Sequence, residues 1–374
     1  MIMKKISVLA LMLAAMCSLN VRAAGHGGTD ANVCGPDGTE PESDGRKWAV
    51  VNTSACFMRA EPDYESSNET QTFMGTVVEV LDSERYWRKI STPDPYVAWT
   101  NDLCLSYMTE EEKDAYIAAP KYIVTAEYSH IYDGKGFGAR RICDLVMGDL
   151  LRQVGSAGKK CAGTQTRVQS GDAGREPAGA DCSGAGNAWS GEWTEVMLPS
   201  GQTGWMQTSD IADFSYWAES RVAQPTLICN FARLFVGVPY MWGGITVTGF
   251  VCSGLTKFVY MMHGILLPRN AREQVLVGEE VPIDVNCMQE GDLLFFGTPA
   301  TADSPMRIGH VAMYIGDNRI IHASQVVRIS SINKWDADYY DREILAVRRI
   351  LGHVDTGEGI VSVACAMKNP DVLF

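Results

Sequence analysis

The stretch VPYMWGGITVTGFVCSG, residues 238–254, places Cys252 on a glycine-rich turn directly before an apolar segment. The residues after it repeat at the i, i+3, i+4, i+7 spacing of an amphipathic helix: Leu255, Phe258, Val259 and Met262. Gly264 is expected to end this helix, because glycine readily adopts the left-handed conformation of a C-terminal cap. The sequence therefore predicts Cys252 at the positive end of a buried helix, which lowers the pKa of a thiol and favours the thiolate.

Two histidines lie on predicted strands downstream of this cysteine. Residues 310–315 alternate with period two, and the turn at 316–318 leads into a second strand, so His310 and His322 should face one site. Cys252 would be the nucleophile and His310 the base, which later protonates the leaving amine. His322 would hold His310 in the required tautomer. A single cysteine or histidine is more often structural, but the three together indicate a cysteine hydrolase.

Length, charge and the first residues restrict the kind of protein. A chain of 374 residues with 46% hydrophobic residues predicts a globular protein of two or three domains. A net charge of −13 argues against a nucleic-acid partner, because phosphate binding needs a basic surface. Lys4 and Lys5 precede an apolar run, and a small-residue cleavage site ends at Ala23. We expect a secretory signal, cleaved near Ala23, and export to the periplasm or cell envelope without stable membrane insertion.

Short alternating runs separated by turns predict two small β domains before the hydrolase segment. The runs are 48–52, 76–81, 87–90 and 96–100, and then 122–128, 138–145, 193–198 and 204–207. Thr109 and Glu112 form a capping box that begins a linker helix. The predicted segments are a signal peptide (1–23), a flexible entry segment (24–45), a first barrel (46–108), the linker helix (109–119), a second barrel (120–215) with a glycine-rich insertion (155–191), the hydrolase domain (222–352) and a tail of unassigned structure (353–374).

The chain contains eleven cysteines, and export permits disulfides. Candidates for pairing are Cys34, Cys56, Cys104, Cys143, Cys161 and Cys182, although buried free thiols are an equally good interpretation. No Cys-x-x-Cys pair exists, so we expect no structural zinc site. No other metal or cofactor is expected either.

Six ordered motifs make residues 225–350 similar to the NlpC-type papain-like cysteine peptidases of bacterial cell-wall metabolism. They are residues 239–244, 249–254, 267–269, 291–293, 309–311 and 321–324. The two preceding segments resemble bacterial Src-homology-3-like domains, through residues 58–62, 71–75 and 87–90 and through residues 193–196 and 201–205. The expected fold class is therefore α+β, with a papain-like catalytic domain preceded by two small all-β barrels.

The resemblance implies an activity and a catalytic set. Members of this family hydrolyse the bond between γ-D-glutamate and a diamino acid, usually diaminopimelate, in peptidoglycan stem peptides. The implied catalytic residues are Cys252, His310 and His322. The partner is then peptidoglycan or its stem peptides, and the backbone amide of Cys252 is a candidate donor to the developing oxyanion.

The resemblance also suggests substrate-binding residues. Tyr240 would lie beside the nucleophile near the oxyanion site, and Ser253 near the D-glutamate of the substrate. For Tyr240 and Trp242, ordinary core packing is an equally good interpretation. Arg269 could meet a substrate carboxylate, but a structural ion pair is the alternative.

Val251 departs from the family, which has aspartate directly before the nucleophile. In members that recycle released stem peptides, this acid and a glutamate of the first barrel hold the free amine of L-alanine. Ser67 lies near that glutamate position, with Glu65 and Glu69 close by. Since a buried ammonium without carboxylates is costly, we expect no requirement for a free N-terminal L-alanine and action on intact wall.

Three other interpretations remain open: a recycling enzyme for free stem peptides, a wall-binding protein with an inactive hydrolase domain, and acyl transfer on the same scaffold. The motif at 181–184, Asp-Cys-Ser-Gly, matches the family's nucleophile motif more literally than Cys252 does. It lacks the apolar helix that should follow, and we do not expect it to be the site.

Overall fold

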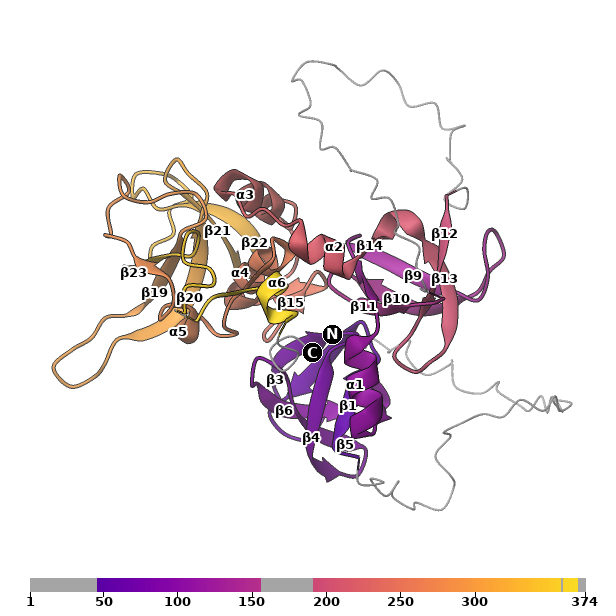
Figure 1. Ribbon diagram of the computed structural model, residues 1–374. Coiled ribbons are helices and arrows are strands. Elements are labelled where there is room, and N and C mark those ends of the chain that lie inside the picture. Colours follow the sequence, from indigo (N-terminus) through magenta and orange to yellow (C-terminus); the bar gives the residue numbers. More distant parts are fainter. Residues whose placement is uncertain (1–45, 156–190, 358, 369–374) are drawn as a thin grey trace, which may run out of the picture. The chain divides into compact units, whose positions relative to one another are not determined.

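The computed structural model describes residues 46–155, 191–357 and 359–368 (Figure 1). Two all-antiparallel β domains precede a larger α+β domain, and the predicted fold class is confirmed. The predicted signal peptide and entry segment, nearly all of the glycine-rich insertion, and the motif at 181–184 lie outside the described residues.

The first domain is a seven-stranded sheet with the order β3-β2-β6-β5-β4-β1-β7. Its strands are β1 Trp48–Val51, β2 Ala55–Arg59, β3 Asn68–Phe73, β4 Val77–Glu84, β5 Trp87–Ser91, β6 Val97–Asn101 and β7 Leu105–Met108. A 3-10 turn, Asp102–Cys104, precedes β7. Inward-facing residues such as Val51, Met58 and Ile90 form a small apolar core.

Helix α1, Glu110–Ala118, connects the two β domains. The Thr109 hydroxyl accepts a hydrogen bond from the backbone N–H of Glu112, and the Glu112 carboxylate accepts one from the N–H of Thr109. The predicted capping box is therefore confirmed. The helix ends before Pro120, which cannot continue it.

The second domain is also a seven-stranded sheet, with the order β10-β9-β13-β12-β11-β8-β14. Its strands are β8 Lys121–Val124, β9 Tyr128–Tyr132, β10 Arg141–Val146, β11 Leu150–Gln153, β12 Trp193–Met197, β13 Thr203–Gln207 and β14 Ile211–Asp213, with a 3-10 turn at Thr208–Asp210. Met74, from the turn after β3, is buried in this second core. The carboxylate of Asp149, which is fully buried, accepts the N–H of Met74 at 2.9 Å and ties the two domains together.

The predicted runs correspond to strands β1, β4, β5, β6, β8, β10, β12 and β13, but six strands were not predicted. The most informative of these is β3, whose sequence Asn-Glu-Thr-Gln-Thr-Phe has no apolar alternation. Thr70 and Gln71 are nevertheless each only 2% exposed. Polar side chains are buried there because they bond to the third domain, as described below.

The third domain is built on a six-stranded sheet with the order β18-β23-β19-β20-β21-β22. Its strands are β18 Glu279–Glu280, β19 Leu293–Thr298, β20 Arg307–Tyr314, β21 Arg319–Ser324, β22 Val326–Ser331 and β23 Ile344–Arg349. Along β19, Leu293 and Phe295 enter one apolar core, and Leu294 and Phe296 enter another on the opposite face. Both faces of this sheet are therefore covered.

Helices cover the sheet face that belongs to the larger core. They are α2 Phe214–Glu219, α3 Pro225–Arg233, α4 Cys252–Met262 and α5 Ala271–Gln274. Helix α4 buries its predicted apolar stripe in this core and ends at Gly264, which has φ +80°. The left-handed cap is thus confirmed.

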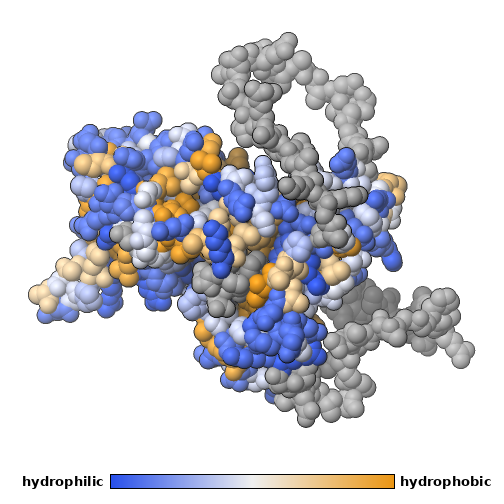
Figure 2. Space-filling model, in the orientation of Figure 1, coloured by the Kyte–Doolittle hydropathy of each residue, from blue (hydrophilic) through white to orange (hydrophobic). Residues whose placement is uncertain are grey.

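Four short strands and a final helix complete the described part of this domain. Strands β15 Ile245–Thr246 and β16 Gly249–Phe250 form a hairpin just before α4. In the segment after residue 353, β24 Val361–Ser362 pairs with β17 Ile265–Leu266, and α6 Val363–Ala366 follows. On the face shown in Figure 2, hydrophobic surface is broken into small areas by hydrophilic residues, as is normal for protein surface in contact with water.

Candidate active site

Cys252 is the first residue of α4 and is 7% exposed. Its thiol lies within reach of backbone N–H groups of Val311, Ser253 and Cys252 itself, which favour the thiolate, but burial outweighs them and raises the pKa of Cys252. The expectation that the helix N-terminus makes this thiol a thiolate is therefore wrong. The contact with Val311 brings β20, the strand of His310, directly against the thiol.

The two predicted histidines meet across strands β20 and β21. Nε2 of His310 lies 2.8 Å from Nδ1 of His322, and the two rings are nearly perpendicular, at 80°. Nε2 of His322 lies 3.1 Å from the hydroxyl of Ser330, a buried residue of β22. Since Nε2 of His310 is engaged, Nδ1 is the nitrogen left to exchange a proton with a thiol.

Both imidazoles are neutral at neutral pH. Burial and the charges of Arg342 and Arg328 lower the pKa of His310 to about 4. Burial, His310 and Arg328 lower the pKa of His322 to about 3. A neutral thiol and a neutral imidazole can react by general-base catalysis, in which the proton moves as the sulfur attacks.

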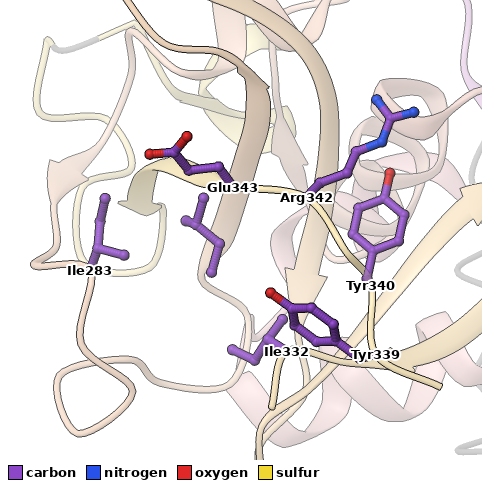
Figure 3. Close-up of a pocket in the computed structure, with 7 residues that line it drawn as sticks. Ile283, Ile332, Tyr339, Tyr340, Arg342 and Glu343 are labelled. Atoms are coloured by element: carbon purple, nitrogen blue, oxygen red, sulfur yellow. The ribbon is translucent and has the colours of Figure 1, made fainter. Parts of the chain in front are cut away.

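Tyr340 belongs to the site and was not predicted. Its ring centroid lies 4.5 Å from that of His322 and 5.4 Å from that of His310. Burial raises the pKa of Tyr340, and the charge of a Cys252 thiolate adds to this effect, as it does for Tyr240. Tyr340 lies in the segment between β22 and β23, where no sequence periodicity could have indicated it (Figure 3).

Arg269 links the first domain to the residue after the nucleophile. The guanidinium is part of a side chain only 4% exposed, and it donates to the Thr70 hydroxyl at 2.6 Å and the Ser253 hydroxyl at 3.2 Å. It also donates to the backbone carbonyls of Glu69 and Gly243. The ion pair considered as an alternative does not occur among the described residues, where hydroxyl and carbonyl oxygens surround this cation.

Strand β3 also positions the turn that leads to the nucleophile. Oε1 of Gln71 accepts the N–H of Ile245 at 3.0 Å and the Thr246 hydroxyl at 3.2 Å. The Asn68 amide donates to the carbonyl of Trp242. Gly243 has φ +77°, and a Cβ there would lie 2.5 Å from Nδ2 of Asn68, so the turn requires glycine.

The other predicted substrate residues differ in exposure. Trp242 is 61% exposed and is not packed in a core, whereas Tyr240 is half-buried and its backbone bonds to Gln325. Val251 is 7% exposed at the N-cap of α4 and offers no side-chain cap.

The described cysteines are all free thiols.

No group of three histidine, cysteine or acidic side chains in the described part of the chain is arranged to hold a metal ion. No helix among these residues has the length and apolar character needed to cross a bilayer.

A buried cysteine at a helix start, packed against an antiparallel sheet that carries a hydrogen-bonded histidine pair, is the arrangement that the sequence predicts for an NlpC-type cysteine peptidase. Residues 237–349 match the model of the NlpC/P60 family. The third domain is therefore an NlpC/P60 family domain, and the two preceding β-sheet domains agree with the predicted architecture.

Known relatives agree with this assignment. The chain is 35% identical over 158 residues to a γ-D-glutamyl-L-lysine dipeptidyl-peptidase of Bacillus cereus, covering 42% of this chain and 45% of the relative. It is 23% identical over 303 residues to dipeptidyl-peptidase 6 of Lysinibacillus sphaericus, covering 78% of this chain and 93% of the relative. A crystal structure of an NlpC/P60 family protein from Bacillus cereus superposes with a TM-score of 0.60 at 24% identity, covering 81% of this chain and 99% of that one. The first of these matches spans less than half of the curated relative.

Proposed function

We propose that this protein is a cysteine peptidase that hydrolyses the γ-D-glutamyl–diamino acid bond of peptidoglycan stem peptides. The observation that carries the proposal is the buried thiol of Cys252 against the strand of His310, whose second nitrogen is held by His322. The family membership and the names of the relatives support the substrate class.

In the proposed reaction, Nδ1 of His310 takes the proton of the Cys252 thiol as the sulfur attacks the γ-carbonyl carbon of D-glutamate. The backbone N–H of Cys252 is the candidate donor to the oxyanion. The imidazolium of His310 then protonates the leaving amine, and a thioester remains. Because burial lowers the pKa of His310 to about 4, its imidazolium is a strong acid for this step. Water, deprotonated by His310, hydrolyses the thioester and releases the thiol.

The test replaces Cys252 by alanine and analyses digests of peptidoglycan and of free stem peptides by mass spectrometry. We expect loss of product by at least about three orders of magnitude, as for removal of other nucleophiles. Cys365→Ala, which removes an exposed thiol of α6, is the matched control and should retain activity. Unchanged product release by Cys252→Ala would refute the assignment of the nucleophile, and absence of product from the wild type would favour a non-catalytic wall-binding protein. Transfer of the acyl group to an added amine in place of water would identify an acyltransferase.

The form of the substrate is a second question. Val251 offers no carboxylate to a free L-alanine amine, which favours stems whose amine is acylated, as in intact wall. The names of the relatives favour the other form, a free peptide from which a dipeptide is released. Glu69 also favours it, because the backbone carbonyl of this half-buried residue of β3 accepts a hydrogen bond from Arg269, which also donates to Ser253 beside the nucleophile.

These forms can be separated with one pair of substrates. L-Ala-γ-D-Glu-diaminopimelate and its N-acetylated form differ only in the amine. Comparable kcat/KM values for the two would support action on intact wall, and exclusive cleavage of the free peptide would establish a dipeptidyl-peptidase. Glu69→Gln should lower activity on the free peptide only if this carboxylate holds the amine.

We also propose that the protein is exported, on the basis of the charged, apolar and small-residue pattern of residues 1–23. Fractionation of expressing cells and determination of the mature N-terminus test this. A mature chain beginning near residue 24 in the envelope fraction is the expected result, and an uncleaved cytoplasmic chain would contradict it.

A further inference from the structure

Arg328 faces the histidine pair from β22. In the register of β21 and β22, Arg328 lies directly opposite His322, so the two side chains project on the same face of the sheet. Ser330, two residues further along the strand, shares that face, and its hydroxyl contact with His322 confirms the direction. The guanidinium of Arg328 thus stands on the active-site face.

Arg342 approaches the same place from the segment before β23. Its Cζ lies 6.0 Å from the ring centroid of Tyr340, and the Tyr340 ring in turn packs on His322 at 4.5 Å. Figure 3 shows the side chains of Arg342 and Tyr340 on one side of a cavity, with the carboxylate of Glu343 directed to the other side.

Both arginines are exposed, and neither makes an ion pair with any other described residue. The nearby carboxylate of Asp338 is already held by Arg319 through two hydrogen bonds of 2.9 and 2.7 Å. The charges of Arg328 and Arg342 reach both His310 and Tyr340. They help to lower the pKa of His310, and at Tyr340 they oppose the larger effect of burial, which raises the pKa. This side of the site is therefore positively charged, and Glu343, the acid that lines the adjoining cavity, directs its carboxylate to the other side.

The adjoining cavity has an apolar wall. Its volume is about 260 Å³, and Ile283, Ile332 and Ile344 line it together with Tyr340, Arg342 and Glu343. An apolar wall with an arginine at its edge fits an aliphatic chain that ends in an anion.

The mechanism decides which part of the substrate lies here. His310 must protonate the leaving amine, so the departing residue lies on the histidine side of the thiol. Ser253 and Arg269 lie at the start of α4 and against β3, where the acyl part would be held. The departing residue in the proposed reaction is the diamino acid.

We propose that Arg328 and Arg342 form a carboxylate-binding subsite for the leaving diamino acid, which selects diaminopimelate over lysine. This rests on the proposed function. The two diamino acids share an aliphatic side chain with a terminal amine, and only diaminopimelate carries a carboxylate there. Two guanidinium groups bind that carboxylate and repel the lone ammonium of lysine.

The experiment measures kcat/KM for L-Ala-γ-D-Glu-meso-diaminopimelate and for L-Ala-γ-D-Glu-L-Lys, each with free and with N-acetylated alanine. The wild type should prefer diaminopimelate by roughly tenfold or more. Arg328→Gln with Arg342→Gln should remove most of that preference, mainly by slowing the diaminopimelate peptide. Because the ratio of the two kcat/KM values is taken at one pH, a change in the pKa of the histidines affects both substrates and cancels. Arg307→Gln, an exposed arginine on the strand of His310, should leave the ratio unchanged.

The outcomes are distinct. A wild type that cleaves both peptides equally, or prefers lysine, would overturn the subsite but leave the proposed function intact. A preference that persists in the double variant would also overturn it. A wild type that cleaves none of the four peptides would overturn the proposed function and the subsite with it.

Discussion

Nε2 of His310 lies 2.8 Å from Nδ1 of His322, while Nε2 of His322 lies 3.1 Å from the Ser330 hydroxyl. These contacts couple the tautomers of the two rings. If the Ser330 oxygen accepts a hydrogen bond from Nε2–H of His322, then Nδ1 of His322 accepts one from Nε2–H of His310. Nδ1 of His310 then carries the lone pair that a base requires. The opposite orientation of the hydroxyl would place a proton on Nδ1.

Ser330 is accordingly a positioning residue, and Ser330→Ala should lower kcat. We expect roughly a tenfold loss, equivalent to about 1 to 2 kcal/mol for a buried polar group left without its partner. KM should change little, because Ser330 does not touch substrate. Ser330→Thr retains the hydroxyl and should recover most of the activity. Equal losses in both variants would indicate a packing role.

The acid limit of activity should lie unusually low for a histidine-dependent enzyme. Burial and nearby arginines lower the pKa of His310 to about 4, so the base remains unprotonated down to about that pH. The pH dependence of kcat/KM reports this pKa in the free enzyme. A limb near pH 6.5, the ordinary value for histidine, would contradict the burial of this ring.

The free energy of unfolding should also depend on the protonation of His310 and His322, and it should fall as the pH is lowered. The folded-state pKa values of His310 and His322, about 4 and about 3, lie below the unfolded value, so the unfolded chain binds more protons in acid. This contribution is complete above pH ~6.5 and is lost as the pH falls toward 4. His310→Gln should reduce the loss of unfolding free energy between pH 7 and 5. An unchanged pH dependence of the unfolding free energy in this variant would contradict a lowered pKa of His310.

Alkylation of Cys252 tests whether the thiol is neutral at rest. Since burial raises the pKa of Cys252, its reaction rate with iodoacetamide should be slow at neutral pH and rise above pH ~9. A preformed thiolate–imidazolium pair would instead react quickly down to acid pH. Cys287 and Cys365, the exposed thiols among the described residues, provide the reference rate in the Cys252→Ala variant.

The contact between the first domain and the nucleophile turn can be tested with two glycines. Gly243→Ala would place a Cβ 2.5 Å from Nδ2 of Asn68 and 2.7 Å from its carbonyl oxygen. Gly237 has a comparable positive φ of +98°, but nothing lies within 4 Å of its Cβ position. Each of the two substitutions to alanine should reduce the free energy of unfolding by about 1 kcal/mol through backbone strain. Only Gly243→Ala should also lower kcat/KM, by tenfold or more. Equal activities would show that the contact does not position the site.

The same design applies between the two β domains. Gly75 and Gly201 both have φ +88°, yet a Cβ at Gly75 would lie 2.5 Å from the carbonyl oxygen of Leu150, whereas Gly201 is open. Gly75→Ala should reduce the free energy of unfolding by about 1 to 3 kcal/mol more than Gly201→Ala, as expected for overpacking. Denaturant titration of both variants measures the difference.

The sequence alone predicted the helix of Cys252 and the hairpin of His310 and His322, because each follows from local periodicity and turns. It did not predict Tyr340, Ser330 or the role of β3. Tyr340 lies in an irregular segment, and Thr70 meets Arg269 across 199 residues of chain. Contacts between residues so far apart in the chain depend on tertiary packing and leave no local pattern in the sequence. The prediction of a thiolate failed for a similar reason, since the burial of Cys252 is a tertiary property.

Strand β3 ends the order of the first sheet, and its polar side chains bond to the third domain. An exposed edge strand is a template for pairing with another chain, so this docking also shields the first domain from self-association. During synthesis the first sheet is complete long before residues 245–269 emerge. Until then the edge of β3 lacks its cover, and a chain truncated before the third domain should aggregate.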